Sequence, residues 1–199
     1  MFRPGFITGN SHTGATNLQG FLSRSLVACI QLGTSPDLVN VKNQVVTVDY
    51  ASRAILYLSP QPDAIGGTFH ITPWSPARDF AWNDLFAWVQ DYGYSLQRLD
   101  YSTWKAKLSL QCRHDPNNAL YPLLPFLNEK IYAQTLTILE HYQNTADFAC
   151  SAAIAALQGS GIHCPVVNRQ MIYTYLYTYL DAFGPQVGLP QPLSVSLLA

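Results

Sequence analysis

Residues 2–9 read FRPGFITG, and the predicted fold depends on this stretch. Aromatic and β-branched side chains lead into a glycine, a pattern that is typical of a strand ending in a turn. Pro4 and Gly5 interrupt the run, because proline has no amide hydrogen to donate and glycine weakens a strand. We therefore expect a strand over residues 2–8, followed by a small, polar loop over residues 10–16.

Strand and helix patterns alternate along the first half of the chain. One helix is expected to begin at Asn17, a residue type that favours helix caps, and to stop at Gly33. After a short apolar strand, Asp49 is placed to accept the unpaired amide donors of the next helix. Such alternation predicts an α/β fold. The expected strands are residues 44–48, 67–72 and 96–99, and the expected helices are residues 17–32, 49–58, 82–92 and 102–111.

The second half of the chain carries helical patterns instead. We expect no strand after Leu99, so residues 100–184 are predicted to form a mainly helical subdomain. The whole chain, residues 1–199, is expected to be one domain. The expected helices lie near residues 128–143, 147–158 and 169–183, with a surface loop over residues 113–122 and a loosely held tail over residues 185–199.

The composition excludes several classes of partner. Only 12% of the residues are charged, well below the roughly 25% that is usual, so we expect a partner to cover part of the surface. The formal net charge is −1 and the basic residues form no run, which argues against nucleic acid as a ligand. No apolar run reaches the ~18 residues that a membrane-spanning helix needs, so we expect no membrane association.

The four cysteines are scattered, without a C-x-x-C pair or metal-ligand spacing. The sequence also begins without a signal-like pattern of basic and then apolar residues. We therefore expect reduced thiols, a cytoplasmic protein and no metal site. The cysteines are Cys29, Cys112, Cys150 and Cys164.

The stretch RPGFITG at residues 3–9, followed by Ser11, His12, Thr13 and Gly14, resembles a segment of the extended short-chain dehydrogenases/reductases. In that family the segment comes directly after the catalytic Tyr-x-x-x-Lys helix. The resemblance implies a partial α/β fold, in which the last strands of a Rossmann-type sheet precede a mainly helical substrate subdomain.

The same resemblance implies where a cofactor would lie. Residues 1–9 and 67–72 would be a remnant of the dinucleotide-binding sheet, and the strand over residues 2–8 would leave one edge unpaired for the rest of that sheet. In the family this strand holds the nicotinamide end of NADP at its carboxyl edge. The implied cofactor-binding residues are Pro4, Gly5, Phe6, Ile7 and Thr8.

Three polar residues follow this strand, where the family's substrate enters. His12, Thr13 and Asn17 are candidates for hydrogen bonds to an acyl chain or to its pantetheine arm. The alternative is that they only satisfy amide groups of the loop itself.

Longer segments resemble the terminal thioester reductase domains of nonribosomal peptide synthetases, which are kin of carboxylic acid reductases. This likeness implies NADPH-dependent release of a carrier-bound acyl or peptidyl thioester as an aldehyde or alcohol. The implied partners are a carrier protein loaded with phosphopantetheine and an upstream cofactor-binding segment. The segments that carry the likeness are residues 20–37, 82–88, 121–126 and 159–165.

The sequence lacks two features that such a reductase needs. It has no Gly-x-x-Gly-x-x-Gly turn to hold the pyrophosphate, and it has no Tyr/Lys pair ahead of the RPG stretch. Tyr101 and Lys105 match Tyr-x-x-x-Lys in letters only, because they follow residues 3–9 where the family's pair precedes them. We therefore expect no catalytic residue, no activity of this chain alone, and NADPH binding only with the missing N-terminal segment. The alternative is a non-catalytic docking module for a carrier protein, or a decayed fragment.

Overall fold

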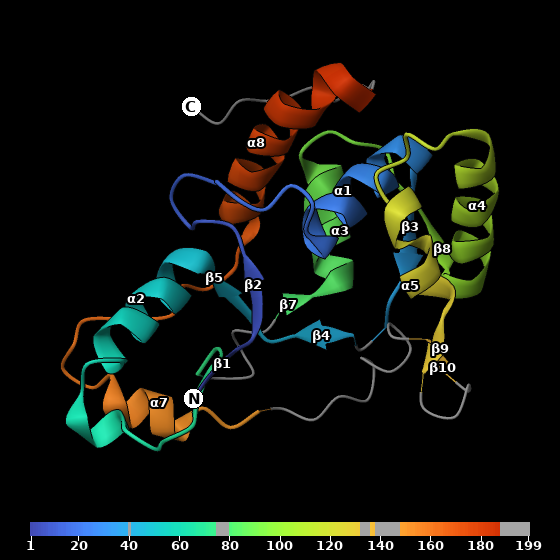
Figure 1. The fold of residues 1–199 in the computed structure, drawn as a ribbon. Helices are drawn as coiled ribbons and strands as arrows, with labels where there is room; N and C mark the ends of the chain where they lie inside the picture. The colour runs from blue at the N-terminus through green and yellow to red at the C-terminus, as the bar shows by residue number, and fades with distance from the viewer. Residues whose placement is uncertain (40, 75–79, 132–135, 138–147, 188–199) are drawn as a thin grey trace.

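The computed structural model describes residues 1–39, 41–74, 80–131, 136–137 and 148–187, and the fold is a mixed α/β arrangement of short strands and helices (Figure 1). The strands are β1 (Phe2–Pro4), β2 (Phe6–Thr8), β3 (Thr34–Asp37), β4 (Lys42–Asn43), β5 (Val45–Thr47), β6 (Phe69–Ile71), β7 (Phe80–Ala81), β8 (Gln97–Asp100), β9 (Lys130–Ile131) and β10 (Leu136–Thr137). The helices are α1 (Phe21–Leu32), α2 (Val48–Leu58), α3 (Trp82–Asp91), α4 (Tyr101–His114), α5 (Leu124–Asn128), α7 (Ser151–Ala156) and α8 (Arg169–Val187), with 3-10 turns η1 (Pro62–Ala64) and η3 (Tyr121–Leu123).

The N-terminal strand is present, but its pairing changes sides at Gly5. β1 pairs in parallel with β6, as expected, whereas β2 pairs in parallel with β5. The amide of Gly5 donates to Ile71 O and the next amide, of Phe6, donates to Gln44 O, both at 2.9 Å. Successive amides of an extended chain point to opposite sides, so β6 and β5 lie on opposite edges of this strand. The expectation of one fully unpaired edge was therefore wrong for the second half of the strand.

On the side of the strand that faces away from β6, the unpaired edge is confined to β1. Met1 O accepts the amide of Phe69, and the register pairs Arg3 with His70, so the alternate residues Phe2 and Pro4 turn their backbone groups away from β6. Within the described ranges, no strand pairs with that edge. Residues 2–4 thus present backbone groups that a further parallel strand could bind.

Two predicted helix caps are wrong. α1 begins after Gly20, and Asn17 instead accepts the amide of Gln19 at 3.0 Å, because residues 17–20 form a separate turn. α2 is capped by Thr47, whose side chain accepts the amide of Tyr50, while Asp49 lies within the first turn of the helix. The predicted stop at Gly33 is confirmed, since this residue adopts the left-handed conformation with φ 63°.

The C-terminal half departs further from the prediction. The described part of residues 128–143 contains the antiparallel pair β9 and β10 and not a helix, so the expectation of no strand after Leu99 was wrong; residues 132–135 and 138–143 lie outside the described residues. β3, which the sequence patterns missed, pairs with β8. The helix predicted near residues 147–158 is present as α7, and the one near 169–183 as α8.

The predicted surface loop at residues 113–122 is partly buried. The backbone of Ala119 is held from α1, since Gln31 accepts its amide at 2.8 Å and Arg24 donates to its carbonyl at 2.7 Å. Leu120 is completely buried in the same region. Of the predicted tail, residues 185–187 belong to α8, and residues 188–199 lie outside the described part of the chain.

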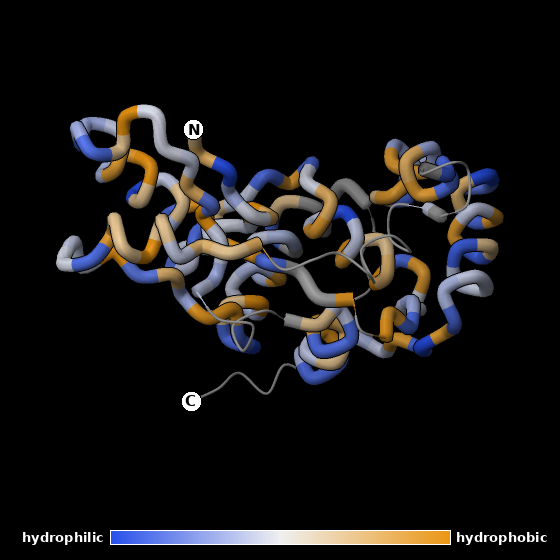
Figure 2. Tube along the Cα trace, turned by 90° about the horizontal axis from the view of Figure 1, so that it is seen from below, coloured by the Kyte–Doolittle hydropathy of each residue, from blue (hydrophilic) through white to orange (hydrophobic). Residues whose placement is uncertain are grey.

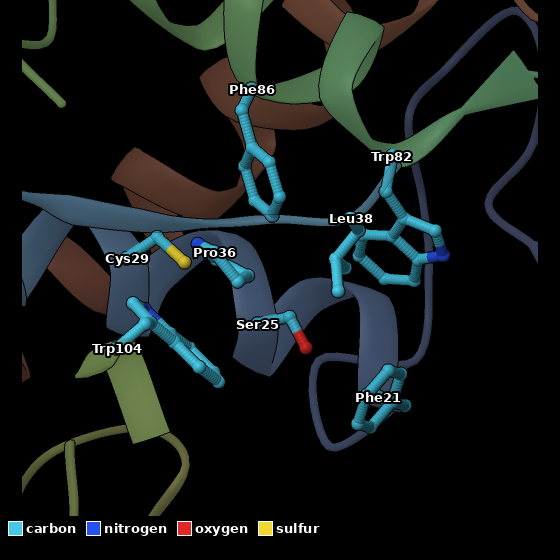
Figure 3. Close-up of a pocket in the computed structure, with 8 residues that line it drawn as sticks. All are labelled: Phe21, Ser25, Cys29, Pro36, Leu38, Trp82, Phe86 and Trp104. Atoms are coloured by element: carbon cyan, nitrogen blue, oxygen red, sulfur yellow. The ribbon is translucent and has the colours of Figure 1, made fainter. Parts of the chain in front are cut away.

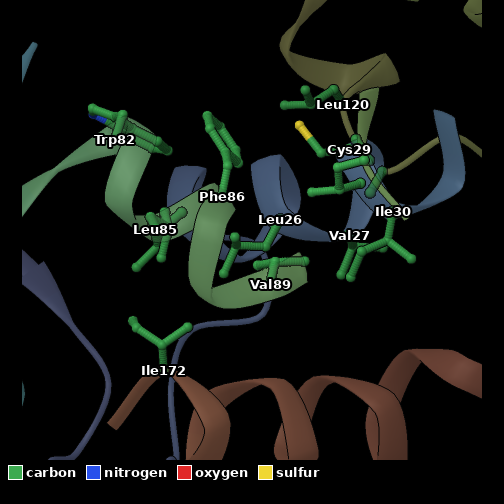
Figure 4. Packing of buried hydrophobic residues seen from close by; sticks show 14 of the residues in the cluster. Leu26, Val27, Cys29, Ile30, Trp82, Leu85, Phe86, Val89, Leu120 and Ile172 are labelled. Atoms are coloured by element: carbon green, nitrogen blue, oxygen red, sulfur yellow. The ribbon is translucent and has the colours of Figure 1, made fainter. Parts of the chain in front are cut away.

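The larger hydrophobic core lies between α1, α3, α4 and α8. Figure 4 shows Leu26, Phe86 and Ile172 in this core, each at most 1% exposed. Figure 2 shows hydrophobic and hydrophilic residues alternating along much of the trace, as expected of helices that each bury one face. The core fixes α1 relative to α8, and the first turn of α1 forms part of the site described below.

A second, smaller core joins α2, β6 and α7, which lie together at one end of the molecule in Figure 1. Tyr50, Ile71 and Leu157 are among its residues. α7 therefore packs on the strands of the N-terminal half, although it comes from the segment predicted as a helical subdomain. The subdomain boundary at residue 100 remains a prediction. Over the described ranges, no helix has the length and apolar character to cross a membrane.

Candidate functional site

A cleft of about 550 Å³ opens at the carboxyl ends of the parallel strands β2 and β5. One wall is the strand itself, and the other is formed by the turn before α1 and the first residues of that helix. Ligands of open parallel sheets bind at this end of the strands. The residues that line the cleft are Gly5, Phe6, Ile7, Thr8, Ala15, Thr16, Asn17, Gly20, Phe21, Leu22, Ser23 and Val48.

Most of the candidate cofactor residues lie along this cleft. Residues 5–8 form one wall, whereas Pro4 is exposed and does not line it. Of the candidate substrate residues, Asn17 lines the cleft, while His12 and Thr13 lie in the adjoining loop outside it. The structure thus brings five of the eight candidates to one cavity, and their roles remain predictions.

Two aliphatic side chains on the cleft wall are open to solvent. Ile7 is 46% exposed and Val48 is 37% exposed. Both lie at the carboxyl ends of neighbouring strands. Apolar surface that lines a cavity favours a ligand with an apolar face, such as the nicotinamide ring of NADP. The residues present therefore fit that end of the cofactor.

Gly5 is required by the protein's own backbone. A Cβ placed on this residue would overlap with the carbonyl oxygen of Gln44, which accepts the neighbouring amide of Phe6. The family resemblance implies that this glycine serves the close approach of a cofactor. The structure supplies an independent reason, because β2 and the residue before β5 cannot come this close with a side chain between them.

A buried hydrogen-bond chain fixes the carboxyl end of β2. The hydroxyl of Tyr175, on α8, donates to Gly9 O at 3.0 Å and lies 3.2 Å from the Thr8 hydroxyl. With the Tyr175 hydrogen on Gly9 O, the single hydroxyl hydrogen of Thr8 can go either to the Tyr175 oxygen or to Val46 O on β5, which lies 3.3 Å away. Burial raises the pKa of Tyr175 well above its ordinary value, and the hydrogen bond to Thr8 opposes this only in part, so the hydroxyl stays a donor at neutral pH.

The helical spacing of apolar residues in 169–183 puts Tyr175 on the apolar face of α8 and does not reveal its polar contact. A tyrosine on a buried face is itself a signal, because its hydroxyl must find a partner inside the protein. The partner, however, lies 166 residues away in sequence and could not be named from the pattern.

Asp49 holds the loop that follows β2. Its carboxylate accepts the backbone amide and the hydroxyl of Ser11, both at 2.9 Å, and it pairs with Arg53 at 3.3 Å. Asn10 accepts the amides of His12 and Thr13 at 2.9 Å and 3.0 Å. The loop beside the cleft is therefore shaped by its own side chains.

The candidate substrate residues make loop contacts as well. The Thr13 hydroxyl accepts the amide of Ala15 at 3.3 Å, and Asn17 accepts the amide of Gln19. Such contacts agree with the alternative that these residues satisfy amide groups of the loop itself. Asn17 still lines the cleft, whereas the exposed residue His12 lies at the tip of the loop.

We expect Asp49→Asn to lower the free energy of unfolding by about 1–3 kcal/mol at neutral pH, because two hydrogen bonds to a charged acceptor are weakened. Partial burial works to raise the pKa of Asp49, but the hydrogen bonds from Ser11 outweigh it and hold this pKa below its ordinary value. The contribution is thus present above the ordinary pKa of an aspartate and is lost as the pH falls through the lowered pKa.

Urea unfolding at several pH values checks this expectation. The difference between the wild-type chain and Asp49→Asn should shrink in acid, where the wild-type carboxylate takes up a proton. Asp63→Asn is the matched control, since that carboxylate is exposed. Equal, small losses for both variants at neutral pH would contradict the role given to Asp49.

Tyr101 and Lys105 lie away from this cleft, on α4. The ammonium group of Lys105 sits over the face of the Tyr101 ring, 5.6 Å from the ring centroid. Neither residue lines the cleft. The i, i+4 spacing puts both residues on one face of α4. The positive charge of Lys105 therefore lies against the Tyr101 ring and not in the cleft.

Comparison with known proteins identifies relatives of the chain. Residues 1–55 match the family model NAD_binding_4, described as male sterility protein. Aldehyde reductase lnaA of Aspergillus flavus is 36% identical over 200 residues, covering 96% of this chain and 18% of that protein. Nonribosomal peptide synthetase asaC of the same species is 33% identical over 148 residues, covering 74% of this chain and 14% of that protein.

A solved structure agrees with these relatives. The terminal R domain from the myxalamid PKS-NRPS biosynthetic pathway superposes with a TM-score of 0.77 at 29% sequence identity, covering 96% of this chain and 45% of that chain. The present chain spans less than a fifth of the length of the two curated relatives. By sequence and by fold, the chain belongs to the family of terminal reductase domains of nonribosomal peptide synthetases, and it resembles the carboxyl-terminal part of such a domain.

Proposed function

We propose that this chain is the substrate-side portion of an NADPH-dependent thioester reductase, which releases a carrier-bound acyl or peptidyl group as an aldehyde or alcohol. The observation that carries the proposal is the cleft at the carboxyl ends of β2 and β5, lined by residues 5–8 and by exposed aliphatic side chains. A reductase needs such a cavity, in which a nicotinamide ring and a thioester can meet away from water.

The residues of this chain would hold the nicotinamide end of the cofactor. Bound NADPH would supply the hydride. Ile7 and Val48 would cover the apolar ring face, and the backbone at Gly5 and Phe6 would border its carboxamide. Thr8 would keep the strand end in place through its contact with Tyr175. Asn17, across the cleft, would hydrogen-bond the acyl group or its pantetheine arm.

The remaining groups would come from a cofactor-binding segment that carries the glycine-rich turn and the Tyr/Lys pair. The unpaired edge of β1 supports this proposal, because the amide and carbonyl groups of Phe2 and the carbonyl of Pro4 face the side where a parallel sheet would continue. The low charged fraction, 12%, is consistent with a surface that a partner covers.

The second candidate function is a docking module for the carrier protein without catalysis. The loop that holds His12 and Thr13 lies beside the cleft, so a pantetheine arm could enter there in either case. The cleft along β2 favours the reductase over the docking module, since docking alone requires no cleft with exposed aliphatic side chains at the strand ends. Carrier-protein binding by itself does not separate the two candidates, whereas cofactor binding does.

The test is NADPH binding by the chain combined with a cofactor-binding half from a related reductase that carries the glycine-rich turn. We expect cofactor fluorescence to change only when both parts are present. Ile7→Asp should weaken binding at least about tenfold, because a carboxylate would lie against the ring. The control Ile65→Asp, at a side chain 84% exposed and outside the cleft, should bind like the wild type. Binding that is equal in both variants, or absent from the wild-type combination, would overturn the proposal.

A further inference from the structure

A second, much narrower cavity lies behind the first turn of α1. Figure 3 shows its walls, which come from α1, α3, α4 and the β3 region. Its volume is about 10 Å³, hardly room for one water molecule. Its lining is mostly apolar, and the polar groups of the lining residues are the Ser25 hydroxyl, the Cys29 thiol and the indole N–H groups of Trp82 and Trp104. The residues that line it are Phe21, Ser25, Cys29, Pro36, Leu38, Trp82, Phe86 and Trp104.

Phe21 separates this slot from the cleft. Among the described residues it is the one that lines both cavities. It is the first residue of α1, and Ser25 and Cys29 continue the same helix face at i+4 and i+8, which places the three side chains in one row along the slot. The wall between the two cavities therefore depends on one aromatic ring.

The ring is held by two aromatic neighbours. It packs edge-on against Trp82 at 5.8 Å and against Phe126 at 5.9 Å between ring centroids. Phe126 is itself 40% exposed, so the support on that side is open to solvent. No hydrogen bond fixes a phenylalanine, and its position rests on this packing alone.

We infer that Phe21 determines the size of the apolar group that the cleft accepts, because its ring fills the space between the cleft and the slot, and the slot by itself has no room for a hydrocarbon tail of the acyl substrate. This inference deepens the proposed function and rests on it. With the ring in place, the acyl group next to the thioester ends at Phe21. With a small residue in its place, the cleft and the slot become one elongated apolar cavity.

The chemistry of the slot restricts what it could hold. Leu38, Trp82 and Phe86 present carbon surface. Burial raises the pKa of the Cys29 thiol far above its ordinary value, with the Trp104 indole only partly opposing this, so the thiol stays neutral. A carboxylate or ammonium group would find no opposite charge among the lining residues and would be poorly solvated. The fitting ligand is a neutral alkyl or aryl group.

The first experiment uses the chain alone and benzene as the probe. Phe21→Ala removes a ring and should add an apolar extension on the order of 100 Å³ to the inner end of the cleft, which is enough room for benzene. We expect saturating benzene to raise the Tm of Phe21→Ala by about 3 °C or more, and to leave the wild type unchanged. Phe148→Ala, which removes an exposed ring elsewhere, is the matched control and should not respond.

The second experiment uses the reductase completed with a cofactor-binding half and a series of acyl thioesters of increasing chain length. Phe21→Ala should shift the preference in kcat/KM toward longer chains by about tenfold or more, and Phe148→Ala should not. If Phe21→Ala does not fold, Phe21→Leu should give a smaller shift in the same direction. An unchanged benzene response together with an unchanged chain-length profile would overturn the inference. Inactivity of the completed wild-type enzyme on every thioester would instead contradict the proposed function, and the benzene result would still decide the slot.

Discussion

Replacing Gly5 with alanine is expected to lower the free energy of unfolding by about 3 kcal/mol or more, because the new Cβ would overlap with a backbone oxygen that cannot rotate away. The overlapping atom, Gln44 O, also accepts the amide of Phe6, and the amide of Gly5 donates to Ile71 O on the opposite edge. Any shift that relieves the overlap therefore stretches a hydrogen bond of one strand pair or the other. Urea unfolding followed by circular dichroism measures the loss.

Gly66→Ala is the control for the general effect of losing a glycine. That residue has φ 80°, and no atom lies within 4 Å of the place that its Cβ would take, so its replacement costs only the backbone strain of about 1 kcal/mol. If Gly5→Ala were no more destabilising than Gly66→Ala, the strand crossing at Gly5 would not have the close approach described here.

Tyr175→Ala is expected to lower the free energy of unfolding by about 3–5 kcal/mol, since it empties a completely buried site and removes the donor to Gly9 O. Tyr177→Ala is the matched control on the same helix. That side chain is 72% exposed, and its removal should change stability by no more than about 0.5 kcal/mol. Thermal unfolding of both variants beside the wild type decides the comparison.

Tyr175→Phe separates the hydroxyl from the ring. It keeps the packing and loses the bonds to Gly9 O and Thr8, so we expect a loss of about 1–2 kcal/mol. The carboxyl end of β2 should also exchange its amide hydrogens faster, because α8 no longer anchors it. A phenylalanine variant as stable and as protected as the wild type would show that the hydroxyl contributes nothing to holding the strand.

The order of strands and helices in the first half could be predicted because it depends on neighbouring residues. Hydrophobic spacing located α1, α2, α3 and α4 to within a few residues, and Gly33 stopped α1 as its backbone freedom predicts. The resemblance of residues 3–9 gave the reductase superfamily, and the resemblance of residues 20–37, 82–88, 121–126 and 159–165 gave the terminal reductase domains. Hydrophobic spacing, a helix-stopping glycine and a short motif each involve only residues that are close in sequence, so a single sequence is enough to recognise them.

The errors arise where contacts outweigh a local pattern. Asp49 does not cap its helix, because Ser11, 38 residues earlier, provides two donors for its carboxylate. β9 and β10 replace part of a predicted helix, where a short antiparallel pair outweighs the helical pattern. For Asp49, a partner distant in sequence decides the outcome, and a pattern within one segment contains no information about that partner. For residues 130–137, the two pairing segments are neighbours in sequence, and the helical spacing alone did not separate a helix from a short antiparallel pair.

By itself the sequence determined the type of fold and the family, and it predicted the stretch from Pro4 to Thr8 as candidate cofactor-binding residues. Only the tertiary structure decided that the strand changes partners at Gly5, that Tyr175 anchors its end, and that Phe21 stands between a cleft and a closed slot. The physical reason is that strand patterns and helix periods arise from neighbouring residues, whereas cavities and buried hydrogen bonds exist only once distant segments have packed together.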